Sequence, residues 1–132
     1  MLHIFSSPPF YTRHITQPMS YNSSTHPLSG NPKLWPFFKH ALDAIDGSHI
    51  NLTAPLAVQS AYQNRKGFIS QNCLFCCMFN LHFSYVLSGW EGSAADARVY
   101  HDAITTDLII PDGWYYLADA GFPHCDQLLV PY

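Results

Sequence analysis

The sequence is poor in charge. Aspartate, glutamate, lysine and arginine make up 11% of its 132 positions, and the formal net charge at pH 7 is −3. Only six residues are lysine or arginine, and the nearest approach to a cationic cluster is Arg65-Lys66. Because phosphate contacts need clustered cations, this balance argues mildly against tight nucleic-acid binding by the segment alone.

Long apolar runs are also missing. No stretch reaches the roughly 18 apolar residues that a membrane-spanning helix needs. The first ten residues lack the basic start and the long apolar stretch of a secretory signal. We therefore expect no membrane partner and an intracellular location, where structural disulfides are rare.

Hydrophobic residues, by contrast, are plentiful. They make up 48% of the chain, and aromatic residues make up 15%. This composition allows a buried core and differs from that of disordered chains. The length fits one domain or part of one. Because residues 1–31 hold several prolines and many small polar residues without a sustained period, we expect an irregular N-terminal segment there and a domain over 32–132.

The spacing of apolar residues predicts a series of short elements in the second part. We expect a short helix over 34–42, strands over 42–46, 68–79, 83–87 and 114–118, a helix over 94–106 and a last extended piece over 127–130. Gly47 is expected to end the first strand, and residues 80–82 are expected to form the turn of a hairpin. The order strand, β-hairpin, helix, strand predicts an α/β fold with a mixed sheet.

Two aspartates stand where these strands are expected to end. Asp46 follows the first strand, and Asp119 follows the strand over 114–118. The helix before the later strand makes parallel pairing with an earlier strand the natural expectation. Neighbouring strands lie about 4.8 Å apart. If these two strands pair, both carboxylates emerge at one edge of the sheet and can share a metal ion.

Four motifs resemble those of a known family. They are Ala44-Ile45-Asp46-Gly47-Ser48-His49-Ile50; Asn64-Arg65-Lys66-Gly67 with Ser70-Gln71-Asn72; Ser88-Gly89-Trp90-Glu91-Gly92-Ser93-Ala94-Ala95-Asp96; and Tyr116-Leu117-Ala118-Asp119-Ala120-Gly121-Phe122-Pro123. In this order and spacing they resemble the nuclease domain of PIF/Harbinger-type transposases, in the DDE endonuclease superfamily, and especially its fungal members. The resemblance covers about residues 32–132.

The resemblance implies an RNase H-like fold, DNA as the ancestral substrate, a nuclear location and a triad of two aspartates and one glutamate that binds Mg²⁺ or Mn²⁺. Asp46 matches the first acid and Asp119 the second. The third acid, on a later helix, has no match before Tyr132, so we expect a C-terminally incomplete domain. No helix-turn-helix is recognisable upstream, so a separate DNA-binding protein is an implied partner. The turn at residues 80–82 lacks the acid that the family commonly carries.

Structural explanations remain open for several of these residues. An aspartate before glycine often only forms a turn, which applies to Asp46 and, before Ala120-Gly121, to Asp119. Ser93 to Asp96 resembles a capping box, which would explain Asp96 as part of a helix start. His49 is expected to pack or to donate a hydrogen bond beside the site. Arg65-Lys66 either touches phosphate or is an exposed pair of cations at the base of a hairpin.

The cysteines raise the question of zinc. Cys73 and Cys76 have the C-x-x-C spacing, with Cys77 beside them and His124 and Cys125 downstream. On a continuous strand, however, residues three apart point to opposite faces and cannot converge on one ion. We therefore expect buried, unreactive thiols.

Three hypotheses about function follow. The first is a metal-dependent DNA endonuclease domain, derived from a transposase, that is inactive alone because its third acid is missing. The second is a non-catalytic, domesticated remnant that acts as a binding or interaction module. The third is a remnant without a selected function. The target DNA sequence and the oligomeric state are not encoded in any motif that we recognise.

Overall fold

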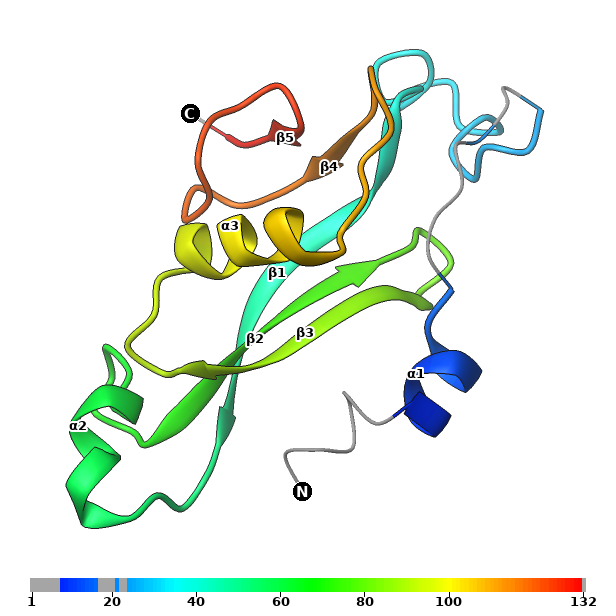
Figure 1. The fold of residues 1–132 in the computed structure, drawn as a ribbon. Helices are drawn as coiled ribbons and strands as arrows, with labels where there is room; N and C mark the ends of the chain where they lie inside the picture. Colours follow the sequence, from blue (N-terminus) through cyan, green and yellow to red (C-terminus); the bar gives the residue numbers. More distant parts are fainter. Residues whose placement is uncertain (1–7, 17–20, 22–23, 132) are drawn as a thin grey trace.

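A computed structural model describes residues 8–16, 21 and 24–131 of the chain. Its centre is a five-stranded sheet, and one helix, α3, packs across it (Figure 1). The elements are α1 (Pro8–His14), β1 (Ala41–Asn51), η1 (Leu56–Val58), α2 (Gln59–Tyr62), β2 (Ser70–Cys77), β3 (Phe83–Glu91), α3 (Asp96–Thr106), β4 (Tyr115–Leu117) and β5 (Leu128–Leu129).

The sheet is mixed, with the strand order β3-β2-β1-β4-β5. β2 pairs antiparallel with both β1 and β3, whereas β4 pairs parallel with both β1 and β5. The chain reaches β4 through α3, as a parallel partner of β1 requires. The predicted α/β class and the parallel pairing of β1 with β4 are confirmed, and the arrangement is consistent with an RNase H-like fold.

β1 is longer than the sequence predicted. Gly47 was expected to end the strand, and this was wrong, because β1 continues to Asn51. β2 pairs with β1 along this whole stretch, from Ala44 opposite Cys77 to Asn51 opposite Ser70. The paired backbone of β2 thus outweighs the weak strand preference of one glycine.

The hairpin of β2 and β3 lies where it was predicted. β3 runs further than expected, to Glu91, because Trp90 and Glu91 still pair with Asn72 and Gln71. The turn between the strands contains Leu81 at a φ of 68°. The hairpin therefore pairs with β1 through β2 and contacts α3 through both of its strands.

The N-terminal part departs from its prediction at two places. Residues 8–14 form α1, in a stretch that was expected to be irregular; Pro8 is tolerated there because the first turn of a helix has no N–H bond to lose. Residues 32–40 form successive turns instead of the predicted helix. The remainder of the predicted irregular segment falls partly on residues 1–7, 17–20, 22 and 23, which lie outside the described residues.

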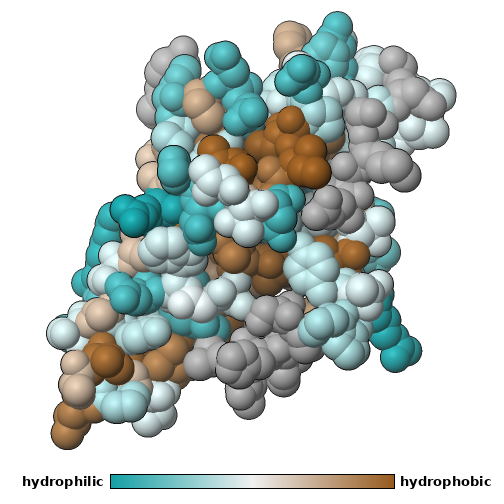
Figure 2. All heavy atoms as spheres, in the orientation of Figure 1, coloured by the Kyte–Doolittle hydropathy of each residue, from teal (hydrophilic) through white to brown (hydrophobic). Residues whose placement is uncertain are grey.

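The core lies between the sheet and α3. Val99, Tyr100 and Ala103 of α3 are buried against Leu74 and Tyr85 of the hairpin, and α3 lies within the helix predicted over 94–106. Among the described residues, no helix has the length and apolar character that crossing a bilayer requires. Hydrophobic side chains also gather at the surface around β4 and β5 and at the tip formed by η1 (Figure 2).

Candidate metal centre

The register of β1 and β4 brings the two predicted acids to the same end of the sheet. Ala44 of β1 is the partner of Leu117 in β4. Asp46 and Asp119 each follow two residues after this pair. Because the strands run parallel, both residues lie towards the same end of the sheet. Both residues are exposed. Asp119 stands just after its strand, as predicted, whereas Asp46 stands inside β1, because that strand continues.

A tight turn fixes the Asp119 side chain. Its Oδ1 accepts a hydrogen bond from the backbone N–H of Gly121 at 2.8 Å, and its carbonyl oxygen accepts one from Phe122 at 3.3 Å. Phe122 is buried in the core and lies edge-on to the ring of Tyr100. The position of Asp119 is therefore set by the core through the turn that follows β4.

A third carboxylate, that of Asp96 in the first turn of α3, lies close to the backbone of Gly47 and to the turn that carries Asp119. A methyl group on Gly47 would overlap Oδ1 of Asp96, and one on Gly121 would lie 3.4 Å from its Oδ2 and 3.0 Å from Oδ1 of Asp119. The two glycines therefore leave room for the carboxylate of Asp96 between β1 and the turn after β4. Asn72 holds it there, because its Nδ2 donates a hydrogen bond of 2.8 Å to Oδ1.

The charges of Asp96 and Asp119 affect the pKa of Asp46, although burial affects it more. Partial desolvation raises the pKa of Asp46, and the N–H of Gly47 counters this by donating a hydrogen bond to the carboxylate. The negative charges of Asp119 and Asp96 raise the pKa further. A group of carboxylates that repel one another is a place where a cation is favoured.

The helix start at Asp96 does not use the predicted capping box. The N-cap residue is Ala95, and no side chain caps the helix. Asp96 is the first residue of α3 instead, and its carboxylate turns towards Asn72 and the sheet. The sequence could not reveal this, because Gly47 and Asn72 approach Asp96 only in the folded chain.

Three further residues singled out in the sequence lie next to this group. His49, two residues beyond Gly47 on the α3 face of the sheet, has its Nδ1 3.1 Å from Oγ of Ser70, which fits the hydrogen-bonding role expected for it. Arg65 and Lys66 are exposed in the turn that leads into β2.

The cysteines behave as buried side chains. β2 is continuous from Ser70 to Cys77, so Cys73 and Cys76 lie on opposite faces of the sheet, as predicted, and both are fully buried. Burial raises the pKa of both thiols above the ordinary value. All four cysteines are free.

Within the part of the chain that the structure describes, no three side chains of histidine, cysteine, aspartate or glutamate converge tightly enough to hold a metal ion. The candidate centre therefore consists of Asp46 and Asp119, with Asp96 adjoining. Oxygen donors of this kind suit hard divalent cations such as Mg²⁺, which bind through one or two carboxylates and keep several waters. The donor set thus fits the metal that the resemblance implies.

Known proteins resemble about two thirds of the chain. HARBI1 of Rattus norvegicus is 31% identical over 93 residues, which are 68% of this chain and 27% of the relative. HARBI1 of Mus musculus is 33% identical over 89 residues, 65% of this chain and 26% of the relative, and HARBI1 of Homo sapiens is 30% identical over 94 residues, 68% and 27%. All three carry the word nuclease in their names.

The chain spans only about a quarter of the length of these relatives. No solved structure matches it. The family model described as DDE superfamily endonuclease matches residues 45–132, which begin just before Asp46 and include Asp96 and Asp119. The chain therefore belongs to the DDE superfamily endonuclease family, and its resemblance to Harbinger-type nucleases is confirmed.

Proposed function

We propose that this chain is a DNA endonuclease domain that binds Mg²⁺ or Mn²⁺ through Asp46 and Asp119. The observation that supports this most is the register of β1 and β4, which sets both acids two residues beyond the pair Ala44–Leu117. The negative charge of Asp119 also raises the pKa of Asp46, the direction expected for neighbouring carboxylates. A bound divalent cation supplies charge neutralisation for phosphodiester cleavage and activates water.

The residues of the chain have separate tasks in this proposal. Asp46 and Asp119 hold the cation. Asp96 adds negative charge beside them while Asn72 fixes its orientation. Gly47 and Gly121 keep the space between these groups free of side-chain atoms. The substrate is DNA, the location is the nucleus, and DNA targeting relies on a separate DNA-binding protein.

We further propose that the domain alone is a poor catalyst. Among the described residues only two carboxylates match the family triad, and no three ligands converge on one ion. The same observation favours a second candidate, a non-catalytic binding module. The two differ in one respect: a nuclease nicks supercoiled DNA in a metal-dependent manner, however slowly, whereas a binding module leaves the DNA intact.

Metal titration by calorimetry tests the proposal. The wild-type chain should give a saturable Mn²⁺ signal, and Asp46→Asn and Asp119→Asn should each abolish it. Asp112→Asn is a matched control, because it removes one exposed acid at the other end of β4. Equal responses in all four proteins would contradict the metal site. A plasmid-nicking assay on the same proteins then separates the nuclease from the binding module.

A further inference from the structure

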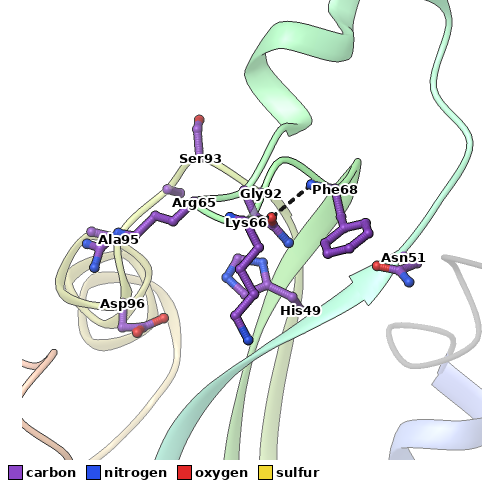
Figure 3. A pocket seen from close by; sticks show the side chains of 11 residues that line it. His49, Asn51, Arg65, Lys66, Phe68, Gly92, Ser93, Ala95 and Asp96 are labelled. Carbon is purple, nitrogen blue, oxygen red and sulfur yellow. Dashed lines mark hydrogen bonds between the residues drawn. The ribbon is translucent and has the colours of Figure 1, made fainter.

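A cavity of about 400 Å³ opens beside the first turn of α3 (Figure 3). Its polar lining includes His49 from β1, Arg65 and Lys66 from the turn before β2, and Ser93 and Asp96 at the start of α3. Asp96 thus belongs both to this cavity and to the acidic group around Asp46. The cavity adjoins the candidate metal centre through Asp96, whereas the Asp46 side chain lies on the opposite face of β1, with Ala44 and Ser48.

Two cations reach into the cavity from one turn. In Figure 3 the side chain of Arg65 extends towards the start of α3, and the ammonium group of Lys66 ends between His49 and Asp96. The first turn of α3 adds backbone N–H groups, because the N-cap residue Ala95 offers no side-chain oxygen to them. Guanidinium, ammonium and helix N–H groups together form a set of donors that suits a phosphate.

The turn that carries the two cations is held firmly. Oδ1 of Asn64 accepts hydrogen bonds of 3.0 Å from the backbone N–H groups of Lys66 and Phe68. Its Nδ2 donates a hydrogen bond of 3.1 Å to Oγ of Ser70, the same hydroxyl that lies beside His49. The turn is therefore tied to β1, and the two cations start from a fixed backbone.

Lysines and arginines elsewhere in residues 24–131 have other surroundings. Lys33 and Lys39 are exposed lysines in the turns before β1 and line none of the cavities described for the fold. Arg98 lies over the ring of Trp90 and lines other cavities. The cations at Arg65 and Lys66 are the ones that share a cavity with a helix N-terminus and adjoin the acids of the centre.

We infer that this cavity binds a backbone phosphate of the DNA substrate. This phosphate neighbours, on the same strand, the phosphate that lies at Asp46 and Asp119 in the proposed function. The inference rests on the proposed function, because it assigns the substrate of that same centre. Arg65 and Lys66 neutralise the phosphate, and the N–H groups of α3 orient it. Contacts of this kind fix the position of a strand and carry no sequence information.

Fluorescence anisotropy with a short labelled DNA duplex tests the inference on the full chain, in the presence of EDTA. Arg65→Ala with Lys66→Ala should weaken binding by at least about tenfold, the loss expected for charged hydrogen bonds. It should also make the slope of log K against log salt less negative by roughly two. Lys33→Ala with Lys39→Ala is the matched control, with the same change of charge and a smaller expected effect.

Several outcomes would overturn the inference. One is an unchanged affinity and slope in the Arg65 and Lys66 double variant. Another is an equal loss in the Lys33 and Lys39 control, which would mean that only net charge matters. Arg65→Lys with Lys66→Arg should keep the salt slope. Circular dichroism melting curves check that all variants are folded, which is expected because all four positions are exposed.

Two further arms separate the possible failures. Asp46→Asn with Asp119→Asn should bind DNA in EDTA at least as well as the wild type, because it removes negative charge. If the metal titration shows no binding while the Arg65 and Lys66 double variant still has a weakened DNA affinity, only the proposed function is contradicted. Inorganic phosphate at constant ionic strength should compete only far above the DNA concentration; tight phosphate binding that DNA cannot displace would overturn DNA as the ligand.

Discussion

The side-chain amide of Asn72 joins β2 to α3 by donating hydrogen bonds to the carbonyl oxygen of Ala94, at 3.1 Å, and to Oδ1 of Asp96, at 2.8 Å. Asn72 is almost fully buried, whereas Asp96 reaches the surface of the site. A polar side chain in the sheet therefore fixes the one carboxylate that adjoins both the acidic group and the cavity.

Replacing Asn72 by alanine should destabilise the chain by about 1–3 kcal/mol, because two buried or partly buried acceptors lose their donor. Urea unfolding measures the change. Asn51→Ala is the matched control, since Asn51 is exposed at the end of β1. A similar loss of unfolding free energy in both variants would show that Asn72 does not have this role.

Gly47→Ala should displace the carboxylate of Asp96, because the added methyl group would overlap its Oδ1. Overpacking of this kind costs about 1–3 kcal/mol. Gly30→Ala, where nothing lies within 4 Å, should change the stability little. The decisive measurement is a double-mutant cycle: adding Asp96→Ala to Gly47→Ala should recover stability, and strictly additive effects would contradict the contact.

Asp43 should make the stability depend on pH. Its carboxyl is fully buried and accepts one hydrogen bond of 2.7 Å, from Oγ of Ser84. Burial raises the pKa of Asp43 from 3.8 to about 6, although the bond from Ser84 counters part of this. Between these values the folded chain holds the proton more firmly than the unfolded chain, so stability falls as the pH rises.

Above pH 6 this effect costs roughly 3 kcal/mol, because each pKa unit corresponds to about 1.4 kcal/mol. Asp43→Asn should therefore stabilise the chain at pH 7 and change it little below pH 4. Urea unfolding across this pH range provides the check, with the exposed Asp112→Asn as control. A wild-type pH dependence that persists in Asp43→Asn would exclude Asp43 as its source.

Leu74→Ala should destabilise the chain by about 2–5 kcal/mol, because Leu74 is fully buried under α3 in the middle of β2. Leu56→Ala removes the same atoms from a side chain that is 88% exposed in η1, and should cost far less. Thermal unfolding of the two variants compares them directly. Similar melting temperatures would mean that the core is not where the structure places it.

Much of the fold could be predicted because local patterns and packing agree there. Val99 and Ala103 recur at helical spacing and are buried in α3. The strand predicted over 68–79 is also present, as β2 over Ser70–Cys77. Where tertiary pairing decides, prediction failed: β1 passes through Gly47 because β2 pairs with it on both sides of that residue.

The region before β1 shows a second limit. Residues 34–42 have apolar residues near helical spacing, yet the chain makes turns there, with Leu34 and Trp35 both donating to the carbonyl of Asn31. Leu42 and Ala41 are already buried in β1, so the sheet takes the end of the stretch that a helix would need. The spacing of apolar residues alone does not show whether Ala41 and Leu42 end a helix or begin a strand.

For the candidate site, strand order and parallel pairing predicted that Asp46 and Asp119 follow matching positions of neighbouring strands, although Asp46 stands inside β1 and not at its end. The neighbourhood of Asp96 did not, since it depends on space left by Gly47 and on the amide of Asn72. A sequence pattern shows that a residue begins a helix, but it does not show which distant glycine faces its side chain.

The parallel pairing of β1 with β4 has a consequence for how the molecule folds. The two strands are separated in the chain by the whole hairpin and by α3, so their contact closes a long loop, a slow event compared with hairpin formation. Docking of β4 also brings like charges together at Asp46 and Asp119. If the proposed centre binds divalent cations, these ions should therefore also change the rate at which β4 docks on β1.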